Sequence, residues 1–120
     1  MSNDTPFVQI DLTPEYKRNL RELSKKYRKI RLDTQPIIEQ LQESNFIGDR
    51  IPGIGENYVI LKVRVKNSDI QKGKSAGYRL IYQIESQASI LLLTIYSKSE
   101  REDISPNEIQ SILAEFYYDE

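Results

Sequence analysis

The chain has 120 residues, a formal net charge of −1, and neither cysteine nor histidine. This length fits a single domain over residues 1–120, which is large enough to bury a core without disulfides. The composition excludes thiolate zinc sites and imidazole catalysis, so acid–base chemistry must use Asp, Glu, Lys, Arg or Tyr. No metal or other cofactor is expected. No apolar run approaches the roughly 20 residues of a membrane span, and residues 1–4 lack a signal-peptide pattern, so we expect a cytoplasmic protein without membrane contact.

The small net charge hides a strong segregation of charge along the chain. Residues 14–33 hold eight basic residues against three acidic ones, and residues 60–80 hold six against one. Residues 99–120 hold seven acidic residues against Arg101 alone. This asymmetry indicates a surface that faces a polyanion and a separate acidic element. Ordinary solvated faces also explain the first basic segment, and they explain the second less well.

The first part of the chain predicts a strand followed by a helix. Residues 7–12 (FVQIDL) alternate apolar and polar side chains, as a short strand does. Thr13 and Pro14 then provide an N-cap and a proline at the first helical position. One apolar stripe follows at helical spacing, made by Tyr16, Leu20, Leu23, Tyr27 and Ile30.

A second helix is expected to begin near residues 33–34, with Pro36 in its first turn. Its apolar face consists of Ile37, Ile38 and Leu41. The short link between the two helices predicts an antiparallel helix hairpin. Residues 45–57, rich in glycine, predict a loop.

Three strands and a final helix are predicted for the second half. Residues 58–66 alternate cleanly, residues 77–84 form the next strand, and residues 90–96 (ILLLTIY) are nearly all apolar. The third strand is therefore expected at the centre of the sheet, covered on both faces. Residues 105–108 (SPNE) form a capping box that begins the last helix.

The order of elements predicts an α+β domain. The single apolar stripe of the first helix predicts that the helix hairpin packs on one face of a twisted, mostly antiparallel sheet. The residues expected in the core are Leu20, Leu23, Leu61, Val63, Leu91, Leu93 and Ile95.

Two segments of the second half resemble the RelE/ParE superfamily of small bacterial toxins. Residues 74–82 (KSAGYRLIY) are similar to the family segment in which a glycine and an aromatic or basic residue precede an arginine. Residues 95–103 (IYSKSERED) are similar to the segment that closes the last strand, especially in the HigB-like branch. The resemblance spans residues 7–117 and implies the RelE-like order β-α-α-β-β-β-α.

The resemblance implies a toxin of a type II toxin–antitoxin pair, neutralised by a cognate antitoxin protein. RelE- and HigB-like members cleave mRNA on the ribosome, which implies a metal-independent endoribonuclease, or mRNA interferase. ParE-like members instead poison DNA gyrase, so a non-enzymatic inhibitor or a catalytically inactive relative stays as the alternative. RelE proper has an arginine and a catalytic tyrosine where this chain has Ser99 and Ser105. That departure favours the alternative.

Cleavage of RNA without a metal uses the ribose 2′-hydroxyl as nucleophile, and needs a base, an acid and positive charge at the phosphate. Lys62, Arg64 and Lys66 stand at alternate strand positions and so point the same way. In the fold that the resemblance implies, the next strand brings Arg79 near them, and its planar fork matches phosphate oxygens. Clustered cations lower the pKa of a lysine, which can then serve as acid or base near neutral pH.

Further candidates lie where the last strand ends. Glu100 or Asp103, which follow Lys98, can take a proton or orient a lysine. The predicted catalytic residues are Lys62, Arg64, Arg79, Lys98 and Glu100. The predicted RNA-binding residues are Lys66, Lys72, Lys74, Tyr82 and Tyr96, with the tyrosines stacking on bases. Each also has an ordinary structural explanation, as the polar face of an edge strand, a salt-bridge partner, a core tyrosine or a loop charge.

Overall fold

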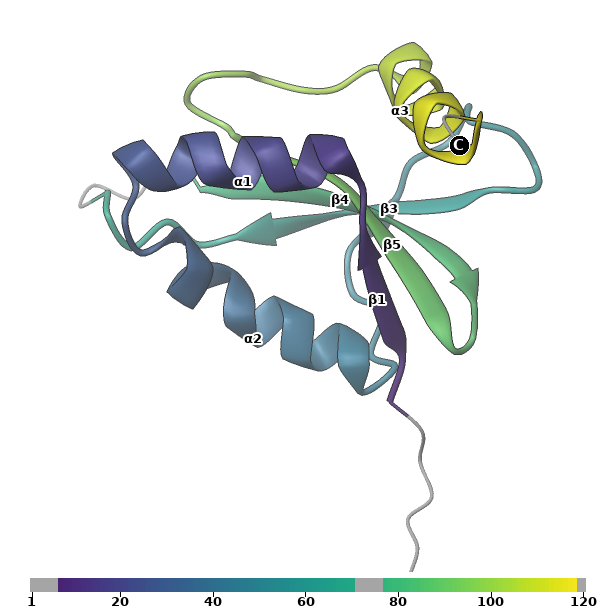
Figure 1. The fold of residues 1–120 in the computed structure, drawn as a ribbon, viewed down its shortest axis with the longest axis horizontal. Coiled ribbons are helices and arrows are strands. Elements are labelled where there is room, and N and C mark those ends of the chain that lie inside the picture. Colours follow the sequence, from purple (N-terminus) through teal and green to yellow (C-terminus); the bar gives the residue numbers. More distant parts are fainter. Residues whose placement is uncertain (1–6, 71–76, 119–120) are drawn as a thin grey trace, which may run out of the picture.

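A five-stranded sheet with helices on both faces organises the protein (Figure 1). The computed structural model describes residues 7–70 and 77–118. The elements follow in the order β1 (Gln9–Leu12), α1 (Pro14–Lys26), α2 (Ile30–Gln42), β2 (Asp49–Arg50), β3 (Val59–Val65), β4 (Tyr78–Ser86), β5 (Ser89–Ser97) and α3 (Pro106–Tyr118). The strand order is β1-β5-β4-β3-β2, with β1 parallel to β5 and the other neighbours antiparallel. The predicted α+β class is confirmed.

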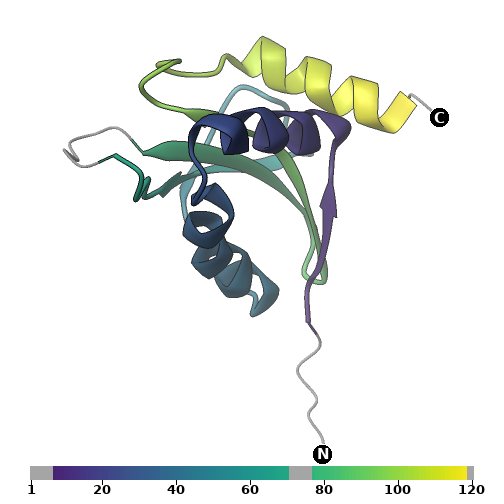
Figure 2. The same cartoon turned by 60° about the vertical axis from the view of Figure 1, so that its left-hand side comes forward.

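Two apolar cores lie on opposite faces of the sheet. On one face α1 and α2 pack over Leu61 and Val63 of β3. On the other face α3 packs over Ile60 of β3 and over Leu91 and Leu93 of β5. Figure 2 shows α2 and α3 on opposite sides of the sheet. Since successive strand residues point to opposite faces, β5 is apolar almost throughout because both of its faces are covered.

Most sequence predictions for the core are confirmed. Six of the seven predicted core residues are buried, and Leu20 is half buried at the margin. The helix hairpin packs on one face, as predicted. The prediction for the apolar strand needs one correction, because β4 holds the middle position and β5 lies between β4 and β1. The predicted loop also contains β2, whose two exposed residues are too few to show an alternation.

Thr13 joins β1 to α1 and fixes where the helix lies. Its backbone N–H donates to the carbonyl of Leu92 (3.1 Å) and its hydroxyl to the carbonyl of Leu93 (2.7 Å). The same hydroxyl accepts from the N–H of Tyr16 (2.9 Å), which caps the helix. Beyond β1, the Asn19 amide donates to the hydroxyl of Thr94 (2.9 Å). Therefore α1 lies along β5 just beyond the point where β1 ends.

The boundary between the two helices differs from the prediction. α1 ends at Lys26, with Tyr27 as its C-cap, and α2 already begins at Ile30. Ile30 is fully buried, but as the first residue of α2 and not as the end of the α1 stripe. Pro36 therefore lies inside α2 and not in its first turn. At this interior position it removes one helical hydrogen bond.

Two hydrogen bonds to residues far along the chain explain why the turn between the helices comes earlier than predicted. The Asp69 carboxylate, in the segment after β3, accepts from the backbone N–H of Lys29 (2.9 Å), which is the N-cap of α2. In return, the Asp33 carboxylate accepts from the backbone N–H of Ser68 (2.8 Å). These two carboxylates join the turn of the helix hairpin to the end of β3.

Two glycines allow close approach to β3. Gly48 has φ +117°, and a Cβ there would lie 2.6 Å from the carbonyl oxygen of Lys62. A Cβ at Gly77 would overlap the carbonyl oxygen of Val65. A larger residue at either position would push a neighbouring segment away from the strand that carries Lys62.

We expect Gly48→Ala to lower the free energy of unfolding by about 1–3 kcal/mol more than Gly53→Ala does. Gly53 also has positive φ (+86°), but the nearest atom to its Cβ would be 3.6 Å away. The pair thus separates the clash with Lys62 from backbone strain, and urea unfolding measures both. Equal losses for the two variants would show that the close approach at Gly48 is relaxed at little cost.

Candidate functional site

The pairing of three strands places one row of polar side chains on the α3 face of the sheet. Arg64 of β3 lies directly opposite Arg79 of β4, and Arg79 lies directly opposite Tyr96 of β5. Lys62 points to the same face two residues before Arg64. The strand register therefore brings Arg79 close to Lys62 and Arg64, as predicted.

We call these residues, together with Arg101 and Asp103 from the segment after β5, the β3–β5 site. Directly opposed like charges on neighbouring strands are destabilising. Within the described residues, neither Arg64 nor Arg79 has an acidic partner at ion-pair distance. Among the residues that the structure describes, the Arg79 guanidinium donates to the carbonyl of Tyr78 alone (3.2 Å). The fold therefore holds two unneutralised arginines side by side, an arrangement that packing does not require.

Tyr96 is the buried residue of the row. Its side chain is only 7% exposed, and its buried hydroxyl has no hydrogen-bond partner in the described part of the protein. The guanidinium carbon of Arg101 lies 5.4 Å from the centre of its ring. Burial raises the pKa of Tyr96, and the Asp103 carboxylate adds to the rise, while Arg79 and Arg101 oppose it. The hydroxyl is therefore protonated at neutral pH and lies near the Asp103 carboxylate, although no hydrogen bond joins the two.

Asp103 pairs with the lysine of the site. One carboxylate oxygen lies 3.2 Å from the Lys62 ammonium and accepts from the backbone N–H of Ile104 (2.8 Å). These contacts lower the pKa of Asp103, the Ile104 N–H most and the lysine second. The aspartate side chain is 65% exposed, so solvent screens this pair and its contribution to stability is small.

Arg101 holds the segment after β5 against α3. Its guanidinium makes a two-pronged ion pair with Glu108, in the first turn of α3, and donates to the carbonyl of Asp103 (2.9 Å). The pKa of Arg101 is raised, first by its hydrogen bond to Glu108. The predicted capping box forms only in half: the Ser105 hydroxyl accepts from the Glu108 N–H (3.2 Å), but the glutamate side chain turns to Arg101.

The remaining predicted catalytic residues lie at the edge of the site or outside its contacts. The Lys98 ammonium donates to the carbonyl of Glu102 (3.1 Å). The Glu100 carboxylate pairs with Lys26 of α1 (2.8 Å) and so ties the segment after β5 to the helix hairpin. Of the two carboxylates considered from the sequence, Asp103 is the one that contacts a site lysine.

The predicted RNA-binding residues separate into three groups. Lys66 is exposed just beyond β3, while Lys72 and Lys74 lie outside the described residues. Tyr82 is fully buried in the core under α1 and α2, and its hydroxyl donates to the carbonyl of Ile47 (2.6 Å). Neither Tyr82 nor Tyr96 offers an exposed ring face, so the prediction that they stack on bases is wrong for both.

Arg101 is the site residue that the sequence predictions missed. It is the one basic residue in an otherwise acidic segment, residues 99–120, and that contrast was its signal. A lone cation among carboxylates indicates a salt bridge, however, and gives no hint of a position over Tyr96.

No known family model matches the chain. In the described parts of the chain, no group of three carboxylates is arranged to hold a metal ion. None of the helices described has both the length and the hydrophobicity needed to cross a bilayer. The case for a function therefore rests on the geometry of the β3–β5 site and on the charges around it.

Removing the Tyr96 hydroxyl should not destabilise the protein. A buried hydroxyl without a partner carries a desolvation penalty of about 1–3 kcal/mol, so Tyr96→Phe should leave the free energy of unfolding unchanged or raise it. Tyr82→Phe is the matched control, because its hydroxyl is bonded to Ile47. The control should lose about 0.5–1.5 kcal/mol. Urea unfolding of both variants tests this, and similar losses would mean that the Tyr96 hydroxyl has a partner in solution.

The carboxyl of Asp103 should titrate below its ordinary value of 3.8. Because the folded pKa is depressed, the stabilisation that accompanies it is present above the unfolded pKa and is lost as pH falls through the folded pKa. Lys62→Gln should raise the pKa only in part, since the Ile104 N–H remains. Carboxyl-carbon NMR titration measures it, with Lys17→Gln on α1 as control. An unchanged pKa in Lys62→Gln would mean that the ion pair does not persist in solution.

Proposed function

We propose that the protein is a RelE/ParE-like toxin of a type II toxin–antitoxin pair that cleaves mRNA on the ribosome. The observation that carries the proposal is the row Arg64–Arg79–Tyr96, with Lys62 beside it and two arginines left without acidic partners in the described residues. Such an arrangement costs stability and suits the binding of a phosphodiester, for which paired guanidinium groups are well shaped.

In the proposed reaction the ribose 2′-hydroxyl gives its proton to a water molecule, its oxygen forms a bond to phosphorus, and the bond from phosphorus to the 5′-oxygen breaks. The products are a 2′,3′-cyclic phosphate and a 5′-hydroxyl. Arg79 and Arg64 would neutralise the charge that develops on the non-bridging oxygens. The Lys62 ammonium would donate a proton to the leaving 5′-oxygen. The depressed pKa makes Asp103 a poor base, so in this proposal its carboxylate only holds Lys62 in the free protein and gives the ammonium up to the incoming phosphate.

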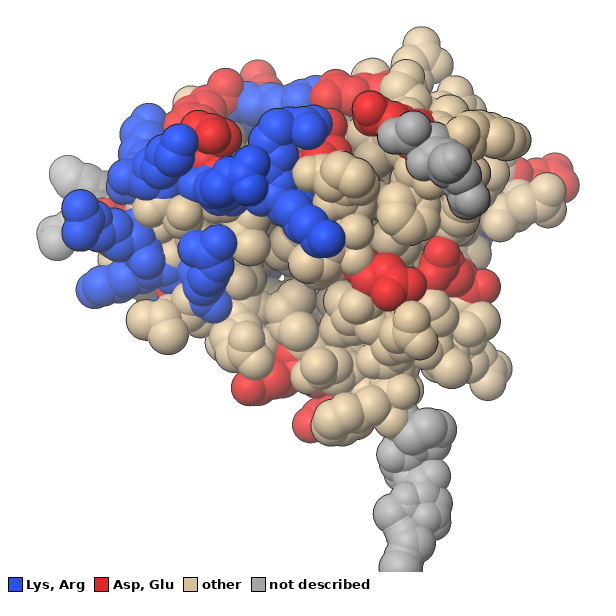
Figure 3. All heavy atoms as spheres, viewed as in Figure 1, with Lys and Arg blue, Asp and Glu red and all other residues tan. Residues whose placement is uncertain are grey.

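A second basic surface supports an RNA-rich target. Figure 3 shows Lys and Arg gathered over α1 and the start of α2. In the described residues these exposed cations lack an ion-pair partner: Lys17, Arg21, Arg28, Lys29 and Arg31. In our proposal this face contacts ribosomal RNA, and a cognate antitoxin in the cytoplasm neutralises the toxin by covering basic surface. Association with either partner would weaken with added salt.

A non-enzymatic inhibitor, such as a gyrase poison or an inactive toxin relative, is the second candidate. The observation that favours it is the use of Ser105 as the cap of α3, at a position that matches the catalytic tyrosine of RelE. Arg101 is likewise occupied by Glu108. Any activity must therefore come from Lys62, Arg64 and Arg79.

Arg79→Ala should abolish growth arrest and lower the rate of mRNA cleavage about 100- to 1000-fold, the usual loss when a donor to a developing oxyanion is removed. Arg79→Lys should recover little, because an ammonium cannot reproduce the planar fork. Arg50→Ala, at an exposed arginine of β2, is the matched control and should remain toxic. The measurements are growth after induced expression and mapping of mRNA ends, with circular dichroism to confirm folding.

Three outcomes would contradict the proposal in different ways. Wild-type expression that neither slows growth nor yields cleaved mRNA rejects the nuclease. Growth arrest with intact mRNA and inhibited DNA supercoiling supports the gyrase-directed candidate. Cleavage by Arg79→Ala at the wild-type rate would reject the assignment of Arg79 to the catalytic site, but not the nuclease activity itself.

A further inference from the structure

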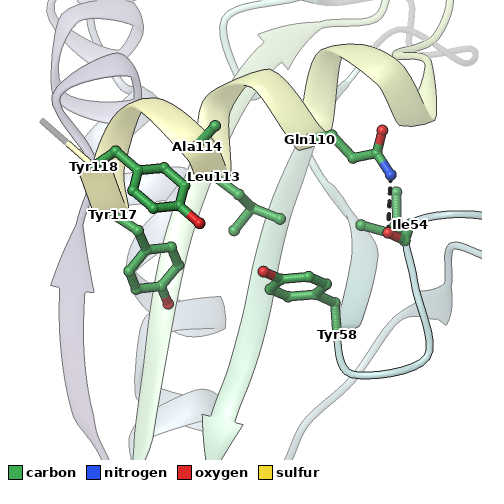
Figure 4. Close-up of a pocket in the computed structure, with 7 residues that line it drawn as sticks. All are labelled: Ile54, Tyr58, Gln110, Leu113, Ala114, Tyr117 and Tyr118. Atoms are coloured by element: carbon green, nitrogen blue, oxygen red, sulfur yellow. Dashed lines mark hydrogen bonds between the residues drawn. The ribbon is translucent and has the colours of Figure 1, made fainter.

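A hollow, called the tyrosine pocket below, lies along the C-terminal half of α3, beyond the turn that Arg101 contacts. It has a volume of about 340 Å³ and is bounded by Ile54 and Tyr58 from the loop before β3 and by α3. Figure 4 shows the ring of Tyr58 on one side of Leu113 and the rings of Tyr117 and Tyr118 on the other. The Gln110 amide donates to the carbonyl of Ile54 (2.9 Å) and links the loop to the helix at one end.

The aromatic walls of this tyrosine pocket face solvent. Tyr118 is 85% exposed and Tyr117 is 38% exposed, although both carry large rings. The ring of Phe116 lies edge-on to that of Tyr117, with 5.2 Å between the ring centres. Within the described chain Tyr118 is largely uncovered and Tyr117 partly so, and both rings border the hollow, where a ligand can reach them.

Of the described residues, no charged one lines the pocket, but one carboxylate contacts a side chain of its wall. The hydroxyl of Tyr117 donates to the Glu85 carboxylate (2.7 Å). Burial and this contact raise the pKa of Tyr117, so the hydroxyl stays protonated and keeps Glu85 at the pocket. Arg50 binds the carbonyl of Tyr58 but is not part of the lining.

We propose that the tyrosine pocket is a docking site for an arginine- or lysine-bearing segment of a partner protein. The faces of aromatic rings attract cations, and a guanidinium also stacks on a tyrosine ring. The Glu85 carboxylate complements the same charge. RNA fits less well, because a phosphate at this wall would meet Glu85. The pocket shares no residue with the β3–β5 site, so this inference stands apart from the proposed function.

The probe is the peptide acetyl-Gly-Arg-Gly-amide, titrated into the full ¹⁵N-labelled chain and followed by amide chemical shifts. Its control is the same peptide with citrulline, which has nearly the shape of arginine but no charge. We expect saturable shifts at residues 54–58 and 110–118 with millimolar affinity for the arginine peptide, and several-fold weaker binding of the citrulline peptide.

Two variants test the named groups. Tyr118→Leu removes an exposed ring without disturbing the core and should weaken binding several-fold, whereas Tyr118→Phe should retain it. Glu85→Gln should weaken binding of the arginine peptide and leave the citrulline peptide unaffected.

Three results would overturn the inference. They are equal binding of the arginine and citrulline peptides, no saturable shift at the pocket up to about 10 mM arginine peptide, and a matching set of shifts on titration with oligouridylate. The last would assign the pocket to RNA. None of these results depends on whether the chain cleaves mRNA.

Discussion

The register of β3, β4 and β5 is the constraint on which the candidate site depends. Backbone pairing places Arg64, Arg79 and Tyr96 in one row, whatever the charges on the side chains. Cores on both faces hold these strands in place, and a shift by one residue would turn the arginines into the core under α1 and α2. The absence of a side chain at Gly77 lets β3 and β4 meet beside this row. The energy that holds two arginines together therefore comes from the sheet and not from the arginines.

Much of the fold could be predicted because its signals are local. The alternation of β3 is visible within seven residues, and the N-cap of α3 at Ser105 within four. The turn between the first two helices was misplaced because Asp69, 40 residues further along the chain, accepts from the backbone of Lys29. A periodic pattern cannot register such a contact, and Ile30 fits the spacing of either helix.

In the candidate site, too, some residues could be placed from local sequence signals and others could not. Strand alternation placed Lys62 and Arg64 on one face, and the strand pairing implied by the resemblance to RelE/ParE toxins brought Arg79 near them. The positions of Asp103 and Arg101 depend on hydrogen bonds in the irregular segment after β5, to Ile104 and Glu108, which have no sequence period. Tyr96 was expected to stack on bases and therefore to be exposed, because the sequence of a strand end does not show whether a helix and a loop cover an aromatic ring.

The two ion pairs of the β3–β5 site differ in how easily a ligand could separate them. The Lys62–Asp103 pair is a single contact with an exposed aspartate, so an incoming phosphate can replace the carboxylate at small cost. The Arg101–Glu108 pair is two-pronged and anchored in the first turn of α3, and separating it would release the segment that carries Asp103. Lys62 is thus suited to exchange partners with a ligand, while Arg101 is suited to hold the wall of the site. In the proposed reaction an incoming phosphate would therefore displace Asp103, the carboxylate that is held less firmly, and leave Arg101 and Glu108 paired.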